Sequence, residues 1–261
     1  MDFLIICLVA LAASGLTLFS GFGLGTLLMP AFALFFPVPT AIAATALVHL
    51  TNNLFKLALL GRAADWRVVL RFGLPAALAA ILGAASLIGI AELAPIAEYD
   101  LAGRRFLVTP VKLVIGTLIV VFALLELTPR FAALAIPGRY LPLGGMISGF
   151  FGGLSGNQGA FRSAFLIKAG LEKKAFVATG VVSAVLVDTT RIAVYGGAFL
   201  TTQAEALPSG IGGLVLAAIV AAFIGAFAGA RLLEKVTMTF VRYAVAVGMI
   251  GIGTALAAGW V

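Results

Sequence analysis

The feature that most constrains this chain is a run of 53 residues, 3–55, that contains no Asp, Glu, Lys or Arg. As one helix this run would be roughly 80 Å long at about 1.5 Å per residue, whereas the hydrocarbon core of a bilayer is about 30 Å thick. The run therefore holds two membrane crossings. Further uncharged runs, each close to the length of one crossing, lie at residues 72–91, 140–161, 206–230 and 243–261.

The composition agrees with a chain that lives in lipid. Only 10% of the 261 residues are charged and 62% are hydrophobic, whereas about a quarter of the residues of a soluble domain are charged. These values exclude a water-soluble fold and predict an all-α integral membrane protein with about eight transmembrane helices. Hydropathy places these helices near residues 3–20, 39–61, 67–90, 107–127, 141–169, 173–197, 209–231 and 239–260.

The basic residues predict topology rather than a nucleic-acid partner. The net charge is +7, and most Lys and Arg side chains fall in short loops, where they orient the chain in the membrane. With the N-terminus outside, nine basic residues fall in cytoplasmic loops, against five outside: Arg62, Arg67, Arg71, Arg130 and Arg139. The N-terminus lacks a basic region like that of a cleavable signal peptide, so we expect the first helix to be retained in the inner membrane.

Metal and redox chemistry are not indicated. Cys7 is the single cysteine, so neither a disulfide nor a cysteine-based metal site can form. His49 is the single histidine and has no neighbouring cysteine or carboxylate in the sequence. We therefore expect no cofactor and no bound metal.

The chain contains a weak internal repeat. A shift of 134 residues aligns glycines, alanines, a threonine and a valine without a gap: Gly25 with Gly159, Ala41 with Ala175, Ala44 with Ala178, Thr45 with Thr179 and Val48 with Val182. One residue further on, Asn53 and Lys56 correspond to Asp188 and Arg191. Each half thus carries a polar residue and a cation spaced i, i+3 on one helix face.

The repeat predicts how the chain is divided. We expect an N-terminal repeat with four helices at residues 1–127, a connecting loop at 128–140 and a C-terminal repeat with four helices at 141–261. Each repeat would begin with a glycine-broken helix, although the first such segment, 21–39, also fits a re-entrant piece. An even number of crossings in each repeat would make the repeats parallel, and an odd number would make them inverted.

The two glycine-rich segments, 21–25 and 152–162, are the predicted substrate site. A break in a membrane helix exposes backbone N–H groups and a positive helix end, and transporters bind substrate at such breaks. Arg162 follows the second break, and its guanidinium fork matches sulfonate, carboxylate or phosphate oxygens. The residues that we predict to contact substrate are Arg162, Arg191, Asn157, Gln158, Asn52, Asn53, Lys56, Gly23, Gly25 and Gly156.

The charges inside the presumed helices predict the sign of the substrate. Three cations, Lys56, Arg162 and Arg191, oppose one carboxylate, Asp188. Such a cavity suits an anion, although each cation could instead reach the lipid headgroups. Asp188 either neutralises Arg191 or couples transport to protons, and His49 either makes hydrogen bonds in the core or handles protons.

Three segments together resemble a known family. They are 21-GFGLGTLLMPAFALFF-36, 43-AATALVHLTNNLFKLALLGR-62 and the region 149–197 around GGLSGNQGAFR. This pattern is similar to that of the TauE/SafE family of membrane permeases. The resemblance implies two four-helix repeats, no cofactor, and transport of sulfite or an organosulfonate. We interpret the chain as an inner-membrane permease that works by alternating access, with export as the energetically simple direction.

Two other functions remain open at this point. A passive anion channel would share the same composition. The sequence 153-GLSG-156 also matches the surroundings of a rhomboid protease nucleophile, which would be Ser155 with His49 as its base. We expect no enzyme activity, because the glycine repeat explains this match better.

Overall fold

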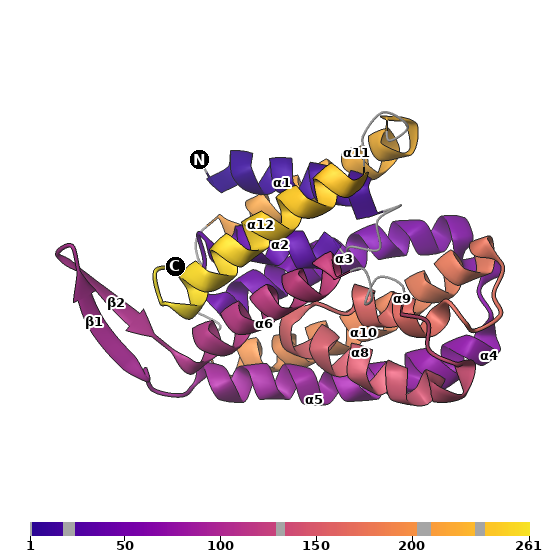
Figure 1. Ribbon diagram of the computed structural model, residues 1–261, viewed down its shortest axis with the longest axis horizontal. Coiled ribbons are helices and arrows are strands. Elements are labelled where there is room, and N and C mark those ends of the chain that lie inside the picture. Colours follow the sequence, from indigo (N-terminus) through magenta and orange to yellow (C-terminus); the bar gives the residue numbers. More distant parts are fainter. Residues whose placement is uncertain (1, 18–23, 129–133, 203–209, 233–237) are drawn as a thin grey trace.

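The computed structural model describes residues 2–17, 24–128, 134–202, 210–232 and 238–261 (Figure 1). Helices dominate this part of the chain, as predicted. The bounds of the helices are α1 Asp2–Thr17, α2 Leu24–Ala33, α3 Val38–Leu60, α4 Trp66–Val68, α5 Leu74–Ala91, α6 Pro110–Leu127, α8 Leu141–Ser155, α9 Gly159–Leu166, α10 Lys173–Thr202, α11 Ile211–Leu232 and α12 Met238–Ala257. Short turns of other helix types are η1 Gly61–Ala63, η2 Val69–Gly73 and η3 Gly138–Tyr140.

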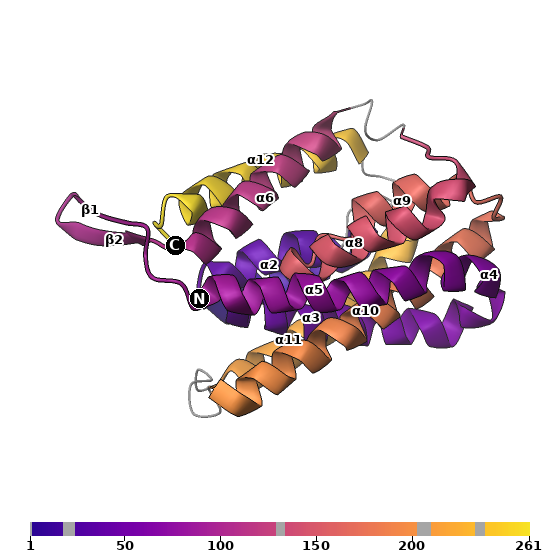
Figure 2. The same cartoon turned by 90° about the horizontal axis from the view of Figure 1, so that it is seen from below.

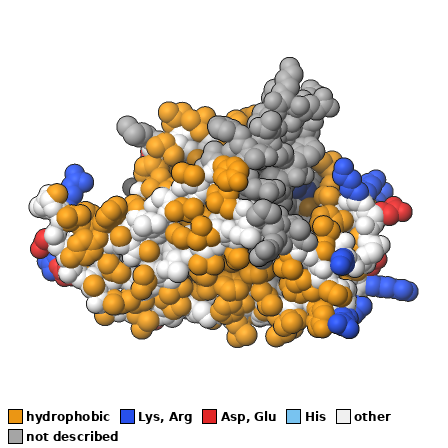
Figure 3. All heavy atoms as spheres, viewed as in Figure 1, with side chains coloured by type: hydrophobic (Ala, Val, Ile, Leu, Met, Phe, Trp, Pro, Cys, Tyr) orange, Lys and Arg blue, Asp and Glu red, His pale blue; other side chains and the backbone are white. Residues whose placement is uncertain are grey.

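The surface of the bundle is suited to lipid. Five helical segments are long and apolar enough to cross a membrane: Val38–Ala63, Trp66–Ala91, Pro110–Leu127, Lys173–Ala198 and Ile211–Ala228. Three shorter apolar helices are Asp2–Gly15, Leu24–Ala33 and Val245–Ala257. Large apolar side chains such as Leu59, Leu82 and Phe227 are exposed, and hydrophobic atoms cover much of the visible face (Figure 3). An apolar face of this kind is suited to contact with hydrocarbon.

A β-hairpin projects from one end of the bundle and was not predicted. Strands β1 (Ala97–Leu101) and β2 (Arg104–Val108) pair antiparallel around a turn at Ala102 and Gly103, which both have positive φ. Two consecutive positive φ values are typical of the tightest hairpin turn. The Tyr99 hydroxyl donates a hydrogen bond of 2.6 Å to the carbonyl oxygen of Ala258, so the hairpin is fastened beside the C-terminus.

Residues 141–169 form a helical hairpin, so the predicted single crossing with a break is wrong here. Helix α8 ends at Ser155, and Gly156 adopts a left-handed conformation with φ of +83°. The backbone N–H of Ile136 donates to the carbonyl oxygen of Ala164, 3.1 Å away, which brings the end of α9 back to the beginning of α8. Because α8 has 15 residues and a length of about 22 Å, the turn lies within the bundle.

Helices α3 and α10 form an antiparallel pair at the centre of the molecule (Figure 2). Near the end of α3, the backbone N–H of Asp65 donates to the hydroxyl of Thr179, near the start of α10. Near the middle of both helices, His49 contacts Asp188. Helices α6 and α12 also pair antiparallel, since Gly116 lies against Gly253 and Ala257 while Gly253 lies against Gly116 and Val120.

Glycines allow α8 to pack directly against α5. A Cβ atom on Gly145, Gly149 or Gly153 would lie 2.2, 1.9 or 2.2 Å from the carbonyl oxygens of Phe72, Ala76 and Ala80, respectively. The matched spacing shows that α5 and α8 run parallel, and close backbone approach of this kind is typical of membrane helices. Helix α11 packs on α1 in a similar way, because a Cβ on Gly225 would lie 2.0 Å from the carbonyl oxygen of Leu11.

The helical hairpin also changes the predicted distribution of charge. A Cβ atom on Gly138 would lie 3.6 Å from the carbonyl oxygen of Lys168. Two loops that were predicted on opposite sides of the membrane therefore lie at the same end of the bundle. The prediction for these loops was therefore wrong. Seven basic residues gather at this end, where α3 ends and α10 begins (Figure 3): Arg62, Arg67, Arg71, Arg139, Lys168, Lys173 and Lys174. Near the β-hairpin lie Arg104, Arg105 and Lys112.

Candidate functional site

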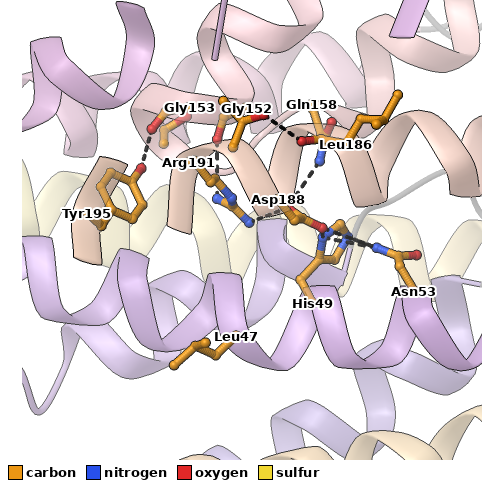
Figure 4. Close-up of polar contacts among 12 residues, drawn as sticks. Leu47, His49, Asn53, Gly152, Gly153, Gln158, Leu186, Asp188, Arg191 and Tyr195 are labelled. Atoms are coloured by element: carbon orange, nitrogen blue, oxygen red, sulfur yellow. Dashed lines mark hydrogen bonds and ion pairs between the residues drawn. The ribbon is translucent and has the colours of Figure 1, made fainter. Parts of the chain in front are cut away.

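A buried polar cluster joins the middle of α3 to the middle of α10 (Figure 4). His49 lies halfway along the 23-residue α3, and Asp188 lies halfway along the 30-residue α10. The Nδ1 atom of His49 is 2.6 Å from Oδ2 of Asp188. Because α3 and α10 run antiparallel, residues near their midpoints meet at one depth of the bundle.

Asp188 is surrounded by donors. Its Oδ1 atom is 2.8 Å from Nη2 of Arg191 and accepts a hydrogen bond of 3.4 Å from the Gln158 amide. Its Oδ2 atom accepts one of 3.4 Å from the Asn53 amide in addition to the contact with His49. A buried carboxylate costs several kcal/mol without such compensation. The i, i+3 ion pair expected between Asp188 and Arg191 is thus present.

Helix α10 also holds the tip of the α8–α9 hairpin. Nη1 of Arg191 donates a hydrogen bond of 3.2 Å to the carbonyl oxygen of Gly152, and the Tyr195 hydroxyl donates to that of Gly153. Both carbonyls lie in the last turn of α8, where a cation is favoured by the helix dipole. Arg191 is fully buried, and so it is not one of the cations that reach the headgroups.

The start of α2 meets the turn between α8 and α9. A Cβ atom on Gly25 would lie 3.2 Å from the carbonyl oxygen of Gly156 and 3.8 Å from the side chain of Thr45. Gly25 is in the first turn of α2, so the N-terminal end of that helix faces the turn. Two of the three predicted glycines therefore come together, while Gly23 lies outside the described residues.

Several polar side-chain atoms of α3, α9 and the turn after α8 are buried without partners. Within the described residues, the atoms that lack a hydrogen-bond partner include Nη1 of Arg162, Nδ2 and Oδ1 of Asn157, Nδ2 of Asn52 and Oγ1 of Thr45. Such atoms are rare in folded proteins, because each one loses its contacts with water and gains none in return. They are therefore available to a small polar ligand.

The two intramembrane side chains that carry a charge without an ion-pair partner among the described residues, Arg162 and Lys56, are both positive. In the described part of the chain, no ion pair includes Arg162 or Lys56, and Asp188 is already shared by Arg191 and His49. Lys56 is partly exposed and lies close enough to Arg162 for their charges to repel. Arg162 contacts α10, because its Nε atom is 3.5 Å from the Cβ position of Gly180.

The pairing that a serine protease needs is not formed. Oγ of Ser155 donates a hydrogen bond of 3.1 Å to the carbonyl oxygen of Phe151, one turn back in its own helix. His49 is engaged by Asp188 and Asn53. The nucleophile and the base of the rhomboid alternative thus each have a different partner.

Sequence reasoning missed Thr45, Ser148 and Tyr195. The alignment of Thr45 with Thr179 in the repeat could have marked the first of these as a position of interest. Tyr195 follows Arg191 by one helical turn and so shares its face, which is a usable signal. Ser148 donates a hydrogen bond of 3.0 Å to the carbonyl oxygen of Gln158, a contact across the helical hairpin that no sequence pattern reveals.

The sequence was compared with curated proteins and with models of protein families. No curated protein matches the chain in sequence. The family model described as sulfite exporter TauE/SafE matches residues 6–256, which is nearly the whole chain. The protein therefore belongs to the TauE/SafE family of membrane transporters.

Proposed function

We propose that this protein carries a small oxyanion, sulfite or an organosulfonate, across the inner membrane by alternating access. The observation that carries the proposal is a set of buried polar atoms without partners among the described residues: the amide of Asn157, which follows Gly156 in the turn that meets Gly25, and Nη1 of the half-buried Arg162 on α9. The guanidinium fork of Arg162 would hold two oxygens of the anion, and the amide of Asn157 would hold another. Asn52, Thr45 and the N-terminal end of α2 would complete the shell.

The charge balance favours an anion and disfavours a cation. Asp188 is neutralised by Arg191, which leaves Arg162 and Lys56 without carboxylate partners among the described residues. A sulfonate or sulfite group presents several oxygens around one centre and can accept hydrogen bonds from all these donors at once. In this proposal, Arg191, Gln158 and Asn53 act indirectly, because their contacts with Asp188 fix the shape of the turn.

The packing pattern supports two repeats of inverted topology. If the pair α1 and α2 corresponds to α8 and α9, then α3 corresponds to α10, α5 to α11 and α6 to α12. Under this exchange the contact of α5 with α8 becomes the contact of α11 with α1, and both are present. The pairs α3–α10 and α6–α12 map onto themselves and run antiparallel, which requires a two-fold axis in the membrane plane. Each repeat then has three full crossings and one helical hairpin.

The grouped basic residues support one orientation. The positive-inside rule places the end with Arg62, Lys168 and Lys173 in the cytoplasm and the β-hairpin outside. The N-terminus then lies outside, as expected from the sequence. An interior-negative potential contributes about 2.3 kcal/mol per charge per 100 mV, so a carrier that moves one net negative charge outward gains roughly 50-fold without coupling. Export is the direction that we propose.

Ligand binding to purified protein tests the proposal. Sulfite, sulfoacetate and taurine should raise the unfolding temperature of the protein in detergent, because a ligand stabilises the state that binds it. Arg162→Gln should remove this rise and leave the unfolding temperature without ligand nearly unchanged. Arg67→Gln, an exposed change at the basic end, is the matched control and should keep the rise. Equal ligand stabilisation in Arg162→Gln and the parent would reject the site.

Flux measurements separate a carrier from a passive channel. In proteoliposomes, a carrier shows saturable flux that is stimulated by substrate on the opposite side. Linear flux with measurable single-channel currents would instead indicate an anion channel and would overturn alternating access.

A further inference from the structure

His49 lies between a carboxylate and an amide in the centre of the bundle. It is 6% exposed, and Asp188 Oδ2 can only accept a hydrogen bond, so the proton of the neutral imidazole resides on Nδ1. The amide nitrogen of Asn53 lies 3.1 Å from Nδ1 and 3.3 Å from the other ring nitrogen, Nε2. Since Nδ1 carries the proton, only Nε2 can accept a hydrogen bond from this amide. In this arrangement a second proton can be added only at Nε2.

We propose that His49 takes up a proton when the oxyanion binds, so that anion and proton occupy the protein together. This inference rests on the proposed function and names a coupled ligand, H⁺, of the same site. On protonation Nε2 becomes a donor, and Asn53 can meet it by rotating its amide to present the oxygen instead of the nitrogen. Asn53 thus serves both protonation states without any backbone movement.

The surrounding charges set the direction of the coupling. Three charged groups act on His49: Asp188 and Arg191 from α10 and Arg162 from α9. Lys56 of α3 lies close to Arg162, and Tyr195 lies one turn beyond Arg191. Without substrate, Asp188 is already paired with Arg191 and Arg162 adds a positive charge without an ion-pair partner among the described residues, so a further positive charge on His49 is opposed. An oxyanion held by Arg162 and Asn157 cancels part of this excess and makes protonation of His49 more favourable. Because linkage is reciprocal, a proton on His49 must also strengthen anion binding.

His49, rather than Asp188, is the group that changes protonation. Both oxygens of Asp188 are occupied by donors, two at Oδ1 and two at Oδ2, and Arg191 is fixed beside it by Gly152. A proton on Asp188 would displace one of these donors. A proton on His49 keeps the contacts of Asp188 with Arg191, Gln158 and His49, and only the 3.4 Å contact with Asn53 is given up when that amide rotates. For a doubly charged oxyanion, one co-bound proton still leaves one negative charge, so the membrane potential continues to favour export.

Proton uptake can be measured directly. Methanesulfonate is the probe, because its sulfonate stays ionised between pH 5.5 and 8 and releases no proton itself. Added to purified protein in weakly buffered detergent with a pH indicator, it should raise the pH near neutrality by an amount that approaches one proton per protein. His49→Gln should bind the probe without proton uptake, and Arg67→Gln should behave like the parent. Equal proton uptake by His49→Gln and the parent would overturn the inference.

The pH dependence of affinity provides a second test on the unmodified protein, which does not depend on how the variant folds. The dissociation constant for methanesulfonate should rise with pH, by up to about tenfold per unit once His49 is neutral without ligand. An affinity that does not change between pH 5.5 and 8 would overturn proton coupling but leave the anion site intact. No binding of methanesulfonate or sulfite at any pH would instead overturn the proposed function itself.

Discussion

Helices α3 and α10 occupy corresponding places in the two halves of the sequence, yet they use the same pair of positions differently. In α10 the pair is Asp188 and Arg191, which are both fully buried and joined at 2.8 Å. In α3 the pair is Asn53 and Lys56. The Asn53 amide donates a hydrogen bond to Asp188 of α10, and Lys56 is partly exposed. The comparison indicates that one half supplies the structural ion pair while the other leaves a free cation near the anion site.

Replacement of the two cations tests this difference and should give the largest effect. Arg191→Met leaves Asp188 buried without its main partner and should lower the free energy of unfolding by about 3–5 kcal/mol. Lys56→Met should change the same quantity by less than about 1 kcal/mol but weaken anion binding. Unfolding in mixed micelles, followed by tryptophan fluorescence, measures both. Similar losses in the two variants would show that the halves do not differ as described.

Asn53→Asp, which gives α3 the same Asp and cation pair as α10, should destabilise the protein by less than Arg191→Met. Asn53→Asp places a second carboxylate about as close to Asp188 as the present 3.4 Å contact. Two neighbouring carboxylates cannot both ionise easily, so we expect a loss of about 2 kcal/mol at neutral pH. The loss should shrink at low pH, where one carboxylate takes up a proton. Asn53→Ala is the control that removes the amide without adding charge, and its loss should not depend on pH in this way.

Substitution of the aligned threonines, Thr45 and Thr179, should give the smallest difference in stability between the two halves. Thr179 accepts a hydrogen bond from the backbone N–H of Asp65, so Thr179→Val should cost about 1 kcal/mol. Oγ1 of Thr45 is buried without a partner, and Thr45→Val should therefore cost nothing or stabilise slightly. Thr45→Val should nevertheless weaken sulfite binding, measured by thermal shift. Unchanged sulfite stabilisation would remove Thr45 from the proposed shell.

Much of the fold could be predicted from the sequence because lipid imposes a simple rule. A helix in hydrocarbon must be apolar and of span length. The predicted segments near α3, α6, α10, α11 and α12, and the one near the continuous helical run Trp66–Ala91, agree with the observed bounds within about five residues. The reversal at Gly156 could not be predicted, because a glycine in a left-handed turn and a glycine at a helix contact look identical in sequence. The β-hairpin was missed because it is short and lies between two strong helical signals.

The residues of the candidate site were partly predictable. Arg162, Asn157 and Gly25 were identified because polar side chains are costly inside a membrane helix and usually mark a functional site, and because glycine clusters can break such a helix. The contact between His49 and Asp188 was beyond prediction, because 139 positions separate the two residues and only the antiparallel packing of α3 and α10 brings them together. Thr45 was missed because a threonine can satisfy its own hydroxyl within a helix, and here it does not.

The glycine contact between α5 and α8 determines which parts of the protein can move together. With backbone carbonyls of η2 and α5 packed against Gly145, Gly149 and Gly153, neither helix can slide or tilt past the other without a steric clash. Yet α5 comes from the first half of the chain and α8 from the second. During transport, α5 must therefore move together with α8 and α9, and α11 must move together with α1. Each of these units contains helices from both halves of the sequence.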